Sequence, residues 1–248
     1  MHNPFSLNGK TILVTGASSG IGRATAIECS KMGATLVITG RNEKRLKETL
    51  SLLEGIGHTM ILSDISDDIQ LDELVEQCPS IDGLVNNAGI TETIMTSFIK
   101  REKLMGVLET NTIAPILLTQ RLLKKKKITR GGSIVFTGSI SGTSVCVGGN
   151  VLYSTSKGAI HGFMKNAALD LSIKGIRVNE VCPGMIDTHI LSDSSIDEEA
   201  LKIEAQRYPM KRFGKPEEVA YGIIYLLSEA ASFVTGSSIV IDGGFTLQ

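Results

Sequence analysis

The sequence predicts an α/β fold in which a parallel sheet is covered by helices on both faces. Short apolar runs recur along the chain, and most are followed by a segment with helical periodicity. Strands and helices alternate in this way when successive strands lie parallel and each helix returns the chain across the sheet. With 248 residues, 42 % of them hydrophobic, the chain is long enough to bury such a sheet.

The apolar runs predict seven strands, which lie at about residues 11–14, 34–39, 59–62, 83–85, 133–137, 175–181 and 238–241. Helices are expected between them, the first from a glycine-rich turn to about residue 32, and the others at about 43–53, 67–77, 100–127, 153–173 and 217–228. No internal repeat and no break in composition divides the chain, so residues 1–248 are expected to form a single domain.

The first expected strand ends in a glycine-rich turn, Gly16 to Gly22, that leads directly into a helix. A helix start offers unpaired N–H groups and the positive end of the helix dipole, and glycine lets the backbone approach an anion closely. The pattern therefore indicates a phosphate site. A tight strand-to-helix connection without a ligand has the same pattern.

The second expected strand ends at Thr39-Gly40, and Arg41 follows. In a dinucleotide site, an acid at this point holds the ribose 2′-hydroxyl, whereas an arginine pairs with a 2′-phosphate. No acid is present here, so the sequence favours NADP(H) over NAD(H). The alternative is that Arg41 is a solvated residue at the start of a helix.

Tyr153 and Lys157 are four residues apart on an expected helix, so their side chains project from one face. A phenol titrates near pH ~10, and a neighbouring ammonium is expected to lower its pKa toward neutrality. Ser139 precedes the pair, and its hydroxyl could hold a substrate oxygen while the tyrosine moves a proton. The pattern is typical of acid/base catalysis, although a Tyr–Lys pair at this spacing also occurs on helix surfaces.

The composition argues against several other classes of function. The formal net charge of −1 provides no field that would recruit nucleic acid or an anionic membrane. No apolar run approaches the ~20 residues that span a bilayer, and the start of the chain has no secretory pattern, so a cytoplasmic location is expected. The four cysteines are scattered without ligand spacing, so no metal site is expected, and isolated histidines such as His161 are not expected to be catalytic.

These motifs together resemble those of the short-chain dehydrogenase/reductase family, and the resemblance covers essentially the whole chain. The matching segments are Thr15–Gly22, Asn86-Asn87-Ala88-Gly89, Asn111, Ser139, Tyr153 with Lys157, Pro183-Gly184 and Ile241–Gly244. The resemblance implies a doubly wound, Rossmann-like domain with a seven-stranded sheet. It places a cofactor half at about 1–150, and the catalytic helix and a substrate lid at about 151–215.

The resemblance also implies a role for each site residue. Tyr153 would be the general acid in reduction, Lys157 would lower its pKa and hold the nicotinamide ribose, and Ser139 would polarise the carbonyl. Asn111 would kink its helix and hold a water that relays protons. The expected cofactor-binding residues are Gly16, Ser18, Ser19, Gly20, Ile21, Arg41, Asp64, Ile65, Asn87, Ala88, Gly89, Tyr153, Lys157, Pro183, Gly184, Ile186 and Thr188.

The chain departs from the common family pattern at two places. Ser139 stands one residue farther from Tyr153 than usual, so either the intervening loop is longer or Ser141 takes the role, and the Ser-x-x-Gly pattern favours Ser139. Ser19 stands where many NADP-dependent members have a basic residue. The expectation of NADP(H) therefore rests mainly on Arg41.

The substrate is less clearly indicated than the reaction. The greatest similarity is to the 3-oxoacyl-acyl-carrier-protein reductases, which predicts reduction of a 3-oxoacyl thioester. The lysines at 124–127, with Arg130 and Lys174, fall where those enzymes dock an acidic carrier, although such a run is also typical of a solvated helix end. The segment 189–207 would be the lid, or an acidic solvated helix face. The alternative substrate is a free sugar, polyol or small ketone.

Two expectations concern assembly and class. Relatives of this type form homotetramers through the helices around Asn111 and Tyr153 and through the last strand, so a homotetramer is expected. A different class of function, a dinucleotide-binding subunit without activity, has no need for the full set of Asn111, Ser139, Tyr153 and Lys157.

Overall fold

The computed structural model describes residues 2–188 and 198–248, and within these ranges it contains one seven-stranded sheet. All neighbouring strands are parallel, in the order β3-β2-β1-β4-β5-β6-β7. The strands are β1 (Thr11–Thr15), β2 (Thr35–Gly40), β3 (Thr59–Leu62), β4 (Ile81–Asn86), β5 (Ile128–Thr137), β6 (Arg177–Pro183) and β7 (Ser238–Ile241). The predicted fold class, a doubly wound parallel sheet, is confirmed.

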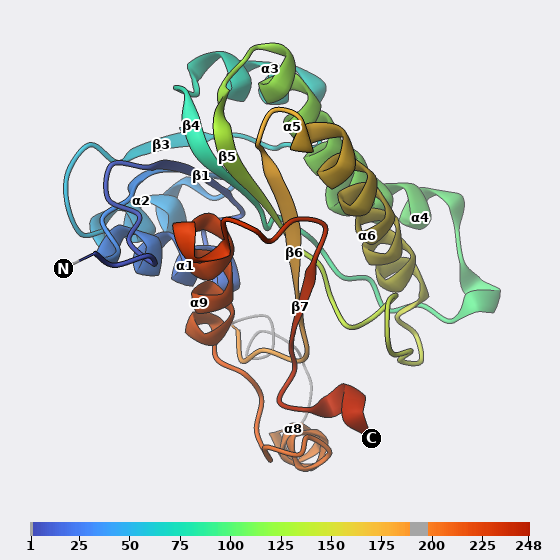
Figure 1. The fold of residues 1–248 in the computed structure, drawn as a ribbon. Coiled ribbons are helices and arrows are strands. Elements are labelled where there is room, and N and C mark those ends of the chain that lie inside the picture. Colours follow the sequence, from blue (N-terminus) through green and yellow to red (C-terminus); the bar gives the residue numbers. More distant parts are fainter. Residues whose placement is uncertain (1, 189–197) are drawn as a thin grey trace.

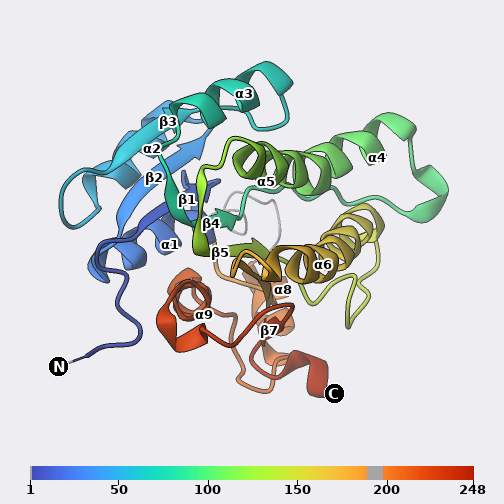
Figure 2. The same cartoon turned by 45° about the horizontal axis from the view of Figure 1, so that its top comes forward.

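Helices cover both faces of this sheet (Figures 1 and 2). One face carries α1 (Gly20–Lys31), α2 (Glu43–Ser51) and α9 (Pro216–Leu227), and the other carries α3 (Asp68–Gln77), α5 (Ala114–Lys124) and α6 (Val151–Ser172), with α4 (Arg101–Leu108) beside α6. α8 (Glu198–Gln206) lies below the sheet in Figure 1. Short 3-10 turns occupy Thr96–Phe98, Glu229–Ala231 and Phe245–Leu247.

The strands are apolar throughout because both faces of the sheet are buried. In β1, Leu13 belongs to the core cluster under α3, α5 and α6, whereas its neighbours Ile12 and Val14 belong to the cluster under α1 and α9. Successive side chains of a strand point to opposite faces, so a run without polar alternation is what a doubly covered sheet requires.

β1 and β4 lie side by side at the centre of the sheet, although two strands separate them in sequence. The chain winds toward one edge after β1 and toward the other edge after β4, so a crevice opens beyond the carboxyl ends of these two strands. Ligands bind at such a switch point in open α/β sheets. Both the glycine-rich turn and the Asn87 segment lie there.

The expected helix at 100–127 is interrupted. A π-helical turn, Glu109–Ile113, separates α4 from α5. The side chain of Asn111 accepts a hydrogen bond from the Ile90 N–H (2.8 Å) and donates one to the Ile90 carbonyl (2.9 Å), which fixes this turn against the segment after β4. Hydrophobic spacing predicted the helical segment but could not indicate the wider turn, because an i→i+5 bond leaves the apolar pattern nearly unchanged.

β5 begins at Ile128, earlier than the predicted residue 133, and continues through two glycines. Gly131 has a φ of +78°, which glycine adopts without the penalty that other residues meet, so the strand continues where a turn would be read from sequence. The first residues of the predicted lid, 189–197, lie outside the described residues, and its remainder is α8.

Within the described parts of the chain, no helix combines the length and apolarity needed to cross a bilayer. The same residues contain no cluster of three or more His, Cys, Asp or Glu side chains placed to hold a metal ion.

Candidate active site

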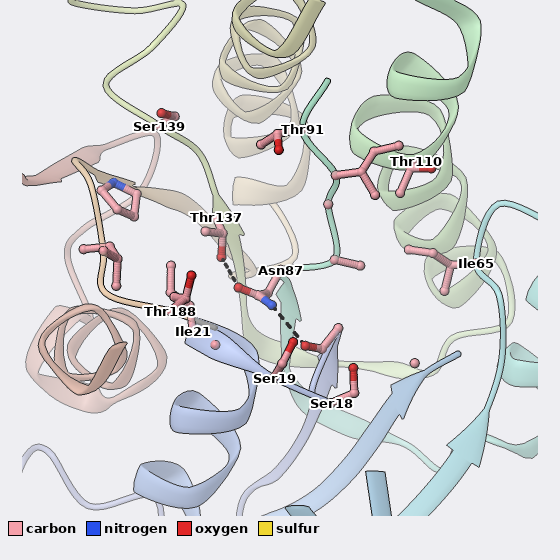
Figure 3. Close-up of a pocket in the computed structure, with 18 of the residues that line it drawn as sticks. Ser18, Ser19, Ile21, Ile65, Asn87, Thr91, Thr110, Thr137, Ser139 and Thr188 are labelled. Carbon is pink, nitrogen blue, oxygen red and sulfur yellow. Dashed lines mark hydrogen bonds between the residues drawn. The ribbon is translucent and has the colours of Figure 1, made fainter. Parts of the chain in front are cut away.

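A cavity of about 530 Å³ lies at the carboxyl ends of the central strands. Every residue predicted to bind the cofactor lines it, from Gly16 in the turn after β1 to Thr188 after β6, and so does Ser139. Figure 3 shows Ser18, Ser19 and Ile21 on one side of this space, with Thr137 and Ser139 from the β5 end and Thr110 from the π-helical turn around it. The sequence therefore located the cavity through residues contributed by several separate loops.

The glycine-rich turn is shaped for a backbone-bound anion. A Cβ on Gly22 would lie 2.3 Å from the Gly16 carbonyl oxygen, and a Cβ on Gly16 would lie 2.8 Å from the Cα of Ala88, so only glycine fits at either position. Ser19 is the N-cap of α1, and its side chain makes no capping hydrogen bond to the helix. The first N–H groups of α1 thus remain available to a phosphate, and the turn fits the pyrophosphate of a dinucleotide.

The turn is held by a side-chain network on the neighbouring strands. Thr15 Oγ1 accepts hydrogen bonds from the backbone N–H groups of Asn87 (3.0 Å) and Ala88 (3.1 Å). The Asn87 side chain donates to the Thr15 carbonyl (3.2 Å) and accepts from the Thr137 hydroxyl (3.2 Å), and Figure 3 draws the bond to Thr137 as a dashed line. The ends of β1, β4 and β5 are therefore fixed relative to one another by polar contacts.

Two arginines stand at the opposite end of the cavity from Tyr153. Arg41 and Arg45 both line it, and the Arg41 guanidinium lies 3.6 Å from the Asp64 carboxylate. Burial raises the pKa of Asp64, but hydrogen bonds from Ser66 and the charge of Arg41 outweigh this effect, so the net pKa is lowered and the carboxylate stays ionised. Sequence reasoning missed Arg45, which lies in the first turn of α2, four residues after Arg41.

Ser139, Tyr153 and Lys157 meet where β5 and α6 come together. The Ser139 hydroxyl forms a hydrogen bond with the Tyr153 phenol, and it also accepts a bond from the Ser141 N–H (3.0 Å). The Lys157 ammonium donates to the Thr137 carbonyl (2.7 Å) and lies 5.5 Å from the centre of the Tyr153 ring. The sequence left open whether Ser139 or Ser141 contacts Tyr153, and in the structure Ser139 makes that contact.

Burial shifts the pKa values of Tyr153 and Lys157. Burial raises the pKa of the Tyr153 phenol, and the hydrogen bond with Ser139 offsets only part of that rise. Burial also lowers the pKa of Lys157 to about 8, partly opposed by the negative charge that Cys182 and Glu180 carry when ionised. Desolvation is the largest influence on both pKa values, and the expectation that Lys157 lowers the pKa of the phenol stays a prediction.

Asn111 lies beside this group without lining the cavity. Its Nδ2 donates to the Ser156 hydroxyl (3.0 Å), and a Cβ on Gly89 would stand 3.3 Å from its Oδ1 and 3.7 Å from Lys157 Nζ. Gly89 therefore separates Asn111 from Lys157.

The β6 end completes the cavity with Pro183, Gly184, Ile186 and Thr188. A Cβ on Gly184 would lie 3.0 Å from the Asp242 side chain, so glycine allows this loop to pack against the segment after β7. Polar residues that the motifs did not indicate also line the cavity, among them Thr91, Thr110 and Thr137. Thr137 could have been found from its position at a strand end. Thr91 and Thr110 reach the cavity only because the loop after β4 packs against the π-helical turn.

Comparisons with known proteins agree with this geometry. The family profile described as Enoyl-(Acyl carrier protein) reductase matches residues 16–246. The 3-oxoacyl-[acyl-carrier-protein] reductase of Aquifex aeolicus is 38 % identical over 97 % of this chain and 98 % of its own length, and an uncharacterised oxidoreductase of Thermotoga maritima is 36 % identical over 98 % and 99 %.

Among solved structures, a short-chain dehydrogenase/reductase mutant of Serratia marcescens superposes with a TM-score of 0.88 at 32 % identity, over 98 % of this chain and 100 % of that one. A candidate 2-deoxy-D-gluconate 3-dehydrogenase of Agrobacterium tumefaciens, solved with bound NADP, superposes with a TM-score of 0.89 at 30 % identity over the full length of both chains. This protein belongs to the short-chain dehydrogenase/reductase family of oxidoreductases.

Proposed function

We propose that the protein is an NADP(H)-dependent reductase that interconverts a carbonyl and a secondary alcohol, with a 3-oxoacyl thioester as its substrate. One observation carries the reaction class: the Ser139 hydroxyl, the Tyr153 phenol and the Lys157 ammonium meet in a cavity whose other wall is a glycine-rich, anion-binding turn. A proton donor and a dinucleotide site in one cavity are what carbonyl reduction requires.

The residues of the chain supply orientation and a proton. When bound, the nicotinamide supplies a hydride, which carries two electrons to the carbonyl carbon. Ser139 donates a hydrogen bond to the carbonyl oxygen, and Tyr153 transfers its phenolic proton to that oxygen as the C=O double bond becomes a C–O single bond. The phenolate then formed is stabilised by the Lys157 ammonium, and a proton from solvent restores the phenol. In the oxidation direction each transfer is reversed.

The adenosine end supports NADP(H). Arg41 and Arg45 would pair with a 2′-phosphate there, and Arg41 would exchange its contact with Asp64 for that phosphate. The bound NADP in the Agrobacterium structure is consistent with this choice. Asp64 also lines this end, so the strength of the preference depends on the release of Arg41 from its carboxylate.

Fluorescence titration with NADPH and NADH tests the cofactor proposal. A charge-assisted contact of about 1.5–3 kcal/mol predicts that Arg41→Ala weakens NADPH binding by roughly 10- to 150-fold and leaves NADH nearly unaffected. Arg101→Ala, which removes an exposed arginine at the start of α4 and away from the cavity, is the matched control. Equal affinities of the wild type for both nucleotides would contradict the proposal.

Two substrate classes are supported by different relatives. The curated proteins named above favour a 3-oxoacyl thioester, whereas the Agrobacterium structure favours a sugar acid. Acetoacetyl-CoA and a set of keto sugars, each assayed with NADPH at equal concentration, separate the two. A larger kcat/KM for the thioester supports the first proposal, and a larger value for a keto sugar replaces it with the second.

The lysines at 124–127, proposed for carrier docking, lie at the amino ends of the strands, whereas the cavity lies at their carboxyl ends. α5 ends at Lys124 and β5 starts at Ile128, whereas the catalytic group is at the carboxyl end of β5. Lys125 pairs with Glu76 (2.6 Å), and Lys127 donates to the Cys78 carbonyl (2.6 Å). A carrier bound to this run would be separated from its own chain's cavity by the ten residues of β5, about 33 Å, so the thioester proposal rests on similarity.

The Tyr153→Phe variant distinguishes an enzyme from a dinucleotide-binding subunit. Phenylalanine keeps the ring and removes only the proton donor. We expect turnover to fall by about 10²-fold or more, with NADPH binding retained. Ser144→Ala, an exposed hydroxyl in the loop after Ser141, is the control. A wild type that binds NADPH and reduces none of the carbonyls tried would favour the subunit.

The homotetramer stays a prediction. Leu169 and Ile173, on α6 and at its end, are 75 % and 83 % exposed, and Val240 on the edge strand β7 is 46 % exposed. These apolar side chains lie on elements that the prediction assigns to contacts between copies. Analytical ultracentrifugation gives the mass directly.

A further inference from the structure

A buried carboxylate that the proposed reaction does not use lies directly behind the catalytic group. Glu180 is on β6 and only 1 % exposed, between Asn179 and Val181 in a strand that begins with Arg177. A charged side chain is rarely buried in this way unless it is paired or has a function. A carboxylate inside an expected strand was visible in the sequence and was not singled out there.

The carboxylate is held from two elements. The Nδ1 atom of His161, on α6, lies 2.5 Å from Glu180 Oε1, and the Ser238 hydroxyl on β7 donates to the same oxygen over 2.6 Å. Nδ1 can donate this bond in the charged imidazole and in one neutral tautomer. Glu180 is therefore held by side chains from both neighbouring elements.

The other carboxylate oxygen approaches the backbone that carries the catalytic contacts. A Cβ on Gly138 would lie 2.8 Å from Glu180 Oε2 and 3.2 Å from Cys182 Sγ, so glycine at this position lets the carboxylate reach β5. Gly138 stands between Thr137, whose carbonyl binds the Lys157 ammonium, and Ser139. The Cys182 thiol connects the two strands, because it hydrogen-bonds the Glu180 carboxylate on β6 and the Ser139 backbone after β5.

We propose that Glu180 is a positioning residue whose buried negative charge keeps Lys157 in its ammonium form at the pH at which the enzyme works. This inference rests on the proposed reaction, in which the ammonium stabilises the Tyr153 phenolate. The need is specific to this chain, since burial lowers the pKa of Lys157 to about 8 even though the charge of Glu180 acts in the opposite direction.

The other titratable groups around Lys157 do not replace Glu180. From α6, Tyr153 and His161 face this region, and neither supplies a negative charge at neutral pH. From β6, Cys182 is the neighbour, and burial raises its thiol pKa to about 12, so it is neutral. β5 contributes Thr137, Gly138 and Ser139, and β7 contributes Ser238, none of which titrates. Among these groups, the negative charge near neutral pH comes from Glu180.

Lysine NMR tests the proposal without relying on turnover. Protein labelled with ¹³C at the lysine ε-carbon is titrated with pH, and the Lys157 signal is identified by its absence in Lys157→Met. We expect Glu180→Gln to lower the titration midpoint of Lys157 by about one pH unit, as loss of a nearby opposite charge does. The alkaline limb of kcat/KM for reduction should move to lower pH by the same amount, a shift that a purely structural role would not cause.

Ser238→Ala is the matched control. It removes a hydrogen bond to the same carboxylate but keeps the charge, so the Lys157 midpoint should stay at the wild-type value. If Glu180→Gln does not fold, Glu180→Asp withdraws the carboxylate by one methylene and should give a smaller fall.

A Lys157 midpoint unchanged in Glu180→Gln, or in the Asp variant where that is used, overturns the proposal. Wild-type protein without turnover would instead contradict the reaction and leave the NMR comparison decisive for Glu180.

Discussion

A methyl group added at Gly22 should weaken NADPH binding about tenfold or more. Its Cβ would stand 2.3 Å from the Gly16 carbonyl oxygen and 2.4 Å from the side-chain nitrogen Nδ2 of Asn87, whereas real Cβ contacts stay beyond 3.0 Å. Both neighbours line the cavity, so the wall must move by some 0.7 Å. Overpacking of this kind costs about 1–3 kcal/mol, and every 1.4 kcal/mol is a factor of ten in affinity.

Gly22→Ala also has an opposing effect on stability. Gly22 lies within α1, where alanine is favoured over glycine by about 1 kcal/mol. Gly106→Ala is therefore the matched control: it makes the same replacement inside α4, where a Cβ would meet nothing within 4 Å. Gly106→Ala should raise the free energy of unfolding by up to about 1 kcal/mol and bind NADPH like the wild type.

Fluorescence titration gives the affinities of both variants, and urea unfolding gives their stabilities. A folded Gly22→Ala protein with wild-type affinity for NADPH would refute the argument, because it would show that the turn does not need close approach of α1 to β4. A protein that loses stability and affinity together, with the control unaffected, supports it.

Two further outcomes follow from the contacts. Thr15→Val should lower the free energy of unfolding by about 1–3 kcal/mol in urea, because it leaves the N–H groups of residues 87 and 88 without their acceptor; unchanged stability would contradict this. Hydrogen bonding and ion pairing with Arg212 lower the pKa of Glu218 to about 2 from the usual 4.5, so the stabilisation by this carboxylate is complete above pH 4.5 and is lost as the pH falls toward 2. The free energy of unfolding, measured across that pH range, should fall less steeply in Glu218→Gln than in the wild type. Parallel curves for the two proteins would contradict the assignment.

The strands and the cavity could be predicted from sequence because both depend on local pattern. The apolar runs located all seven strands, and glycine together with strand-end motifs located the cavity, since parallel strands bring their carboxyl ends to one edge. The family resemblance implied a kink at Asn111, but hydrophobic spacing could not predict the π-helical turn at Glu109–Ile113, because that turn depends on how the Asn111 side chain binds the Ile90 backbone across a loop.

The place of the lysines at 124–127 in the fold could be predicted, but their role could not. Its sequence showed lysines at a helix end, and alternation of strand and helix implies that the end of α5 lies at the amino edge of the sheet. The family resemblance assigned carrier docking to these lysines. The topology, however, separates the amino ends of the strands from Ser139, Tyr153 and Lys157 by the length of β5. Topology constrains such a proposal more strongly than charge does, because a solvated run of lysines is compatible with either edge.

The charge states of the catalytic group show where sequence reasoning stops. Spacing on a helix predicts that Tyr153 and Lys157 are neighbours, and the structure agrees. Spacing says nothing about burial, and burial acts on the two groups in opposite directions, raising the pKa of the phenol and lowering that of the ammonium. A catalytic ammonium that is buried among neutral groups needs a nearby negative charge to stay protonated, and in this chain Glu180 occupies the place where such a charge would act.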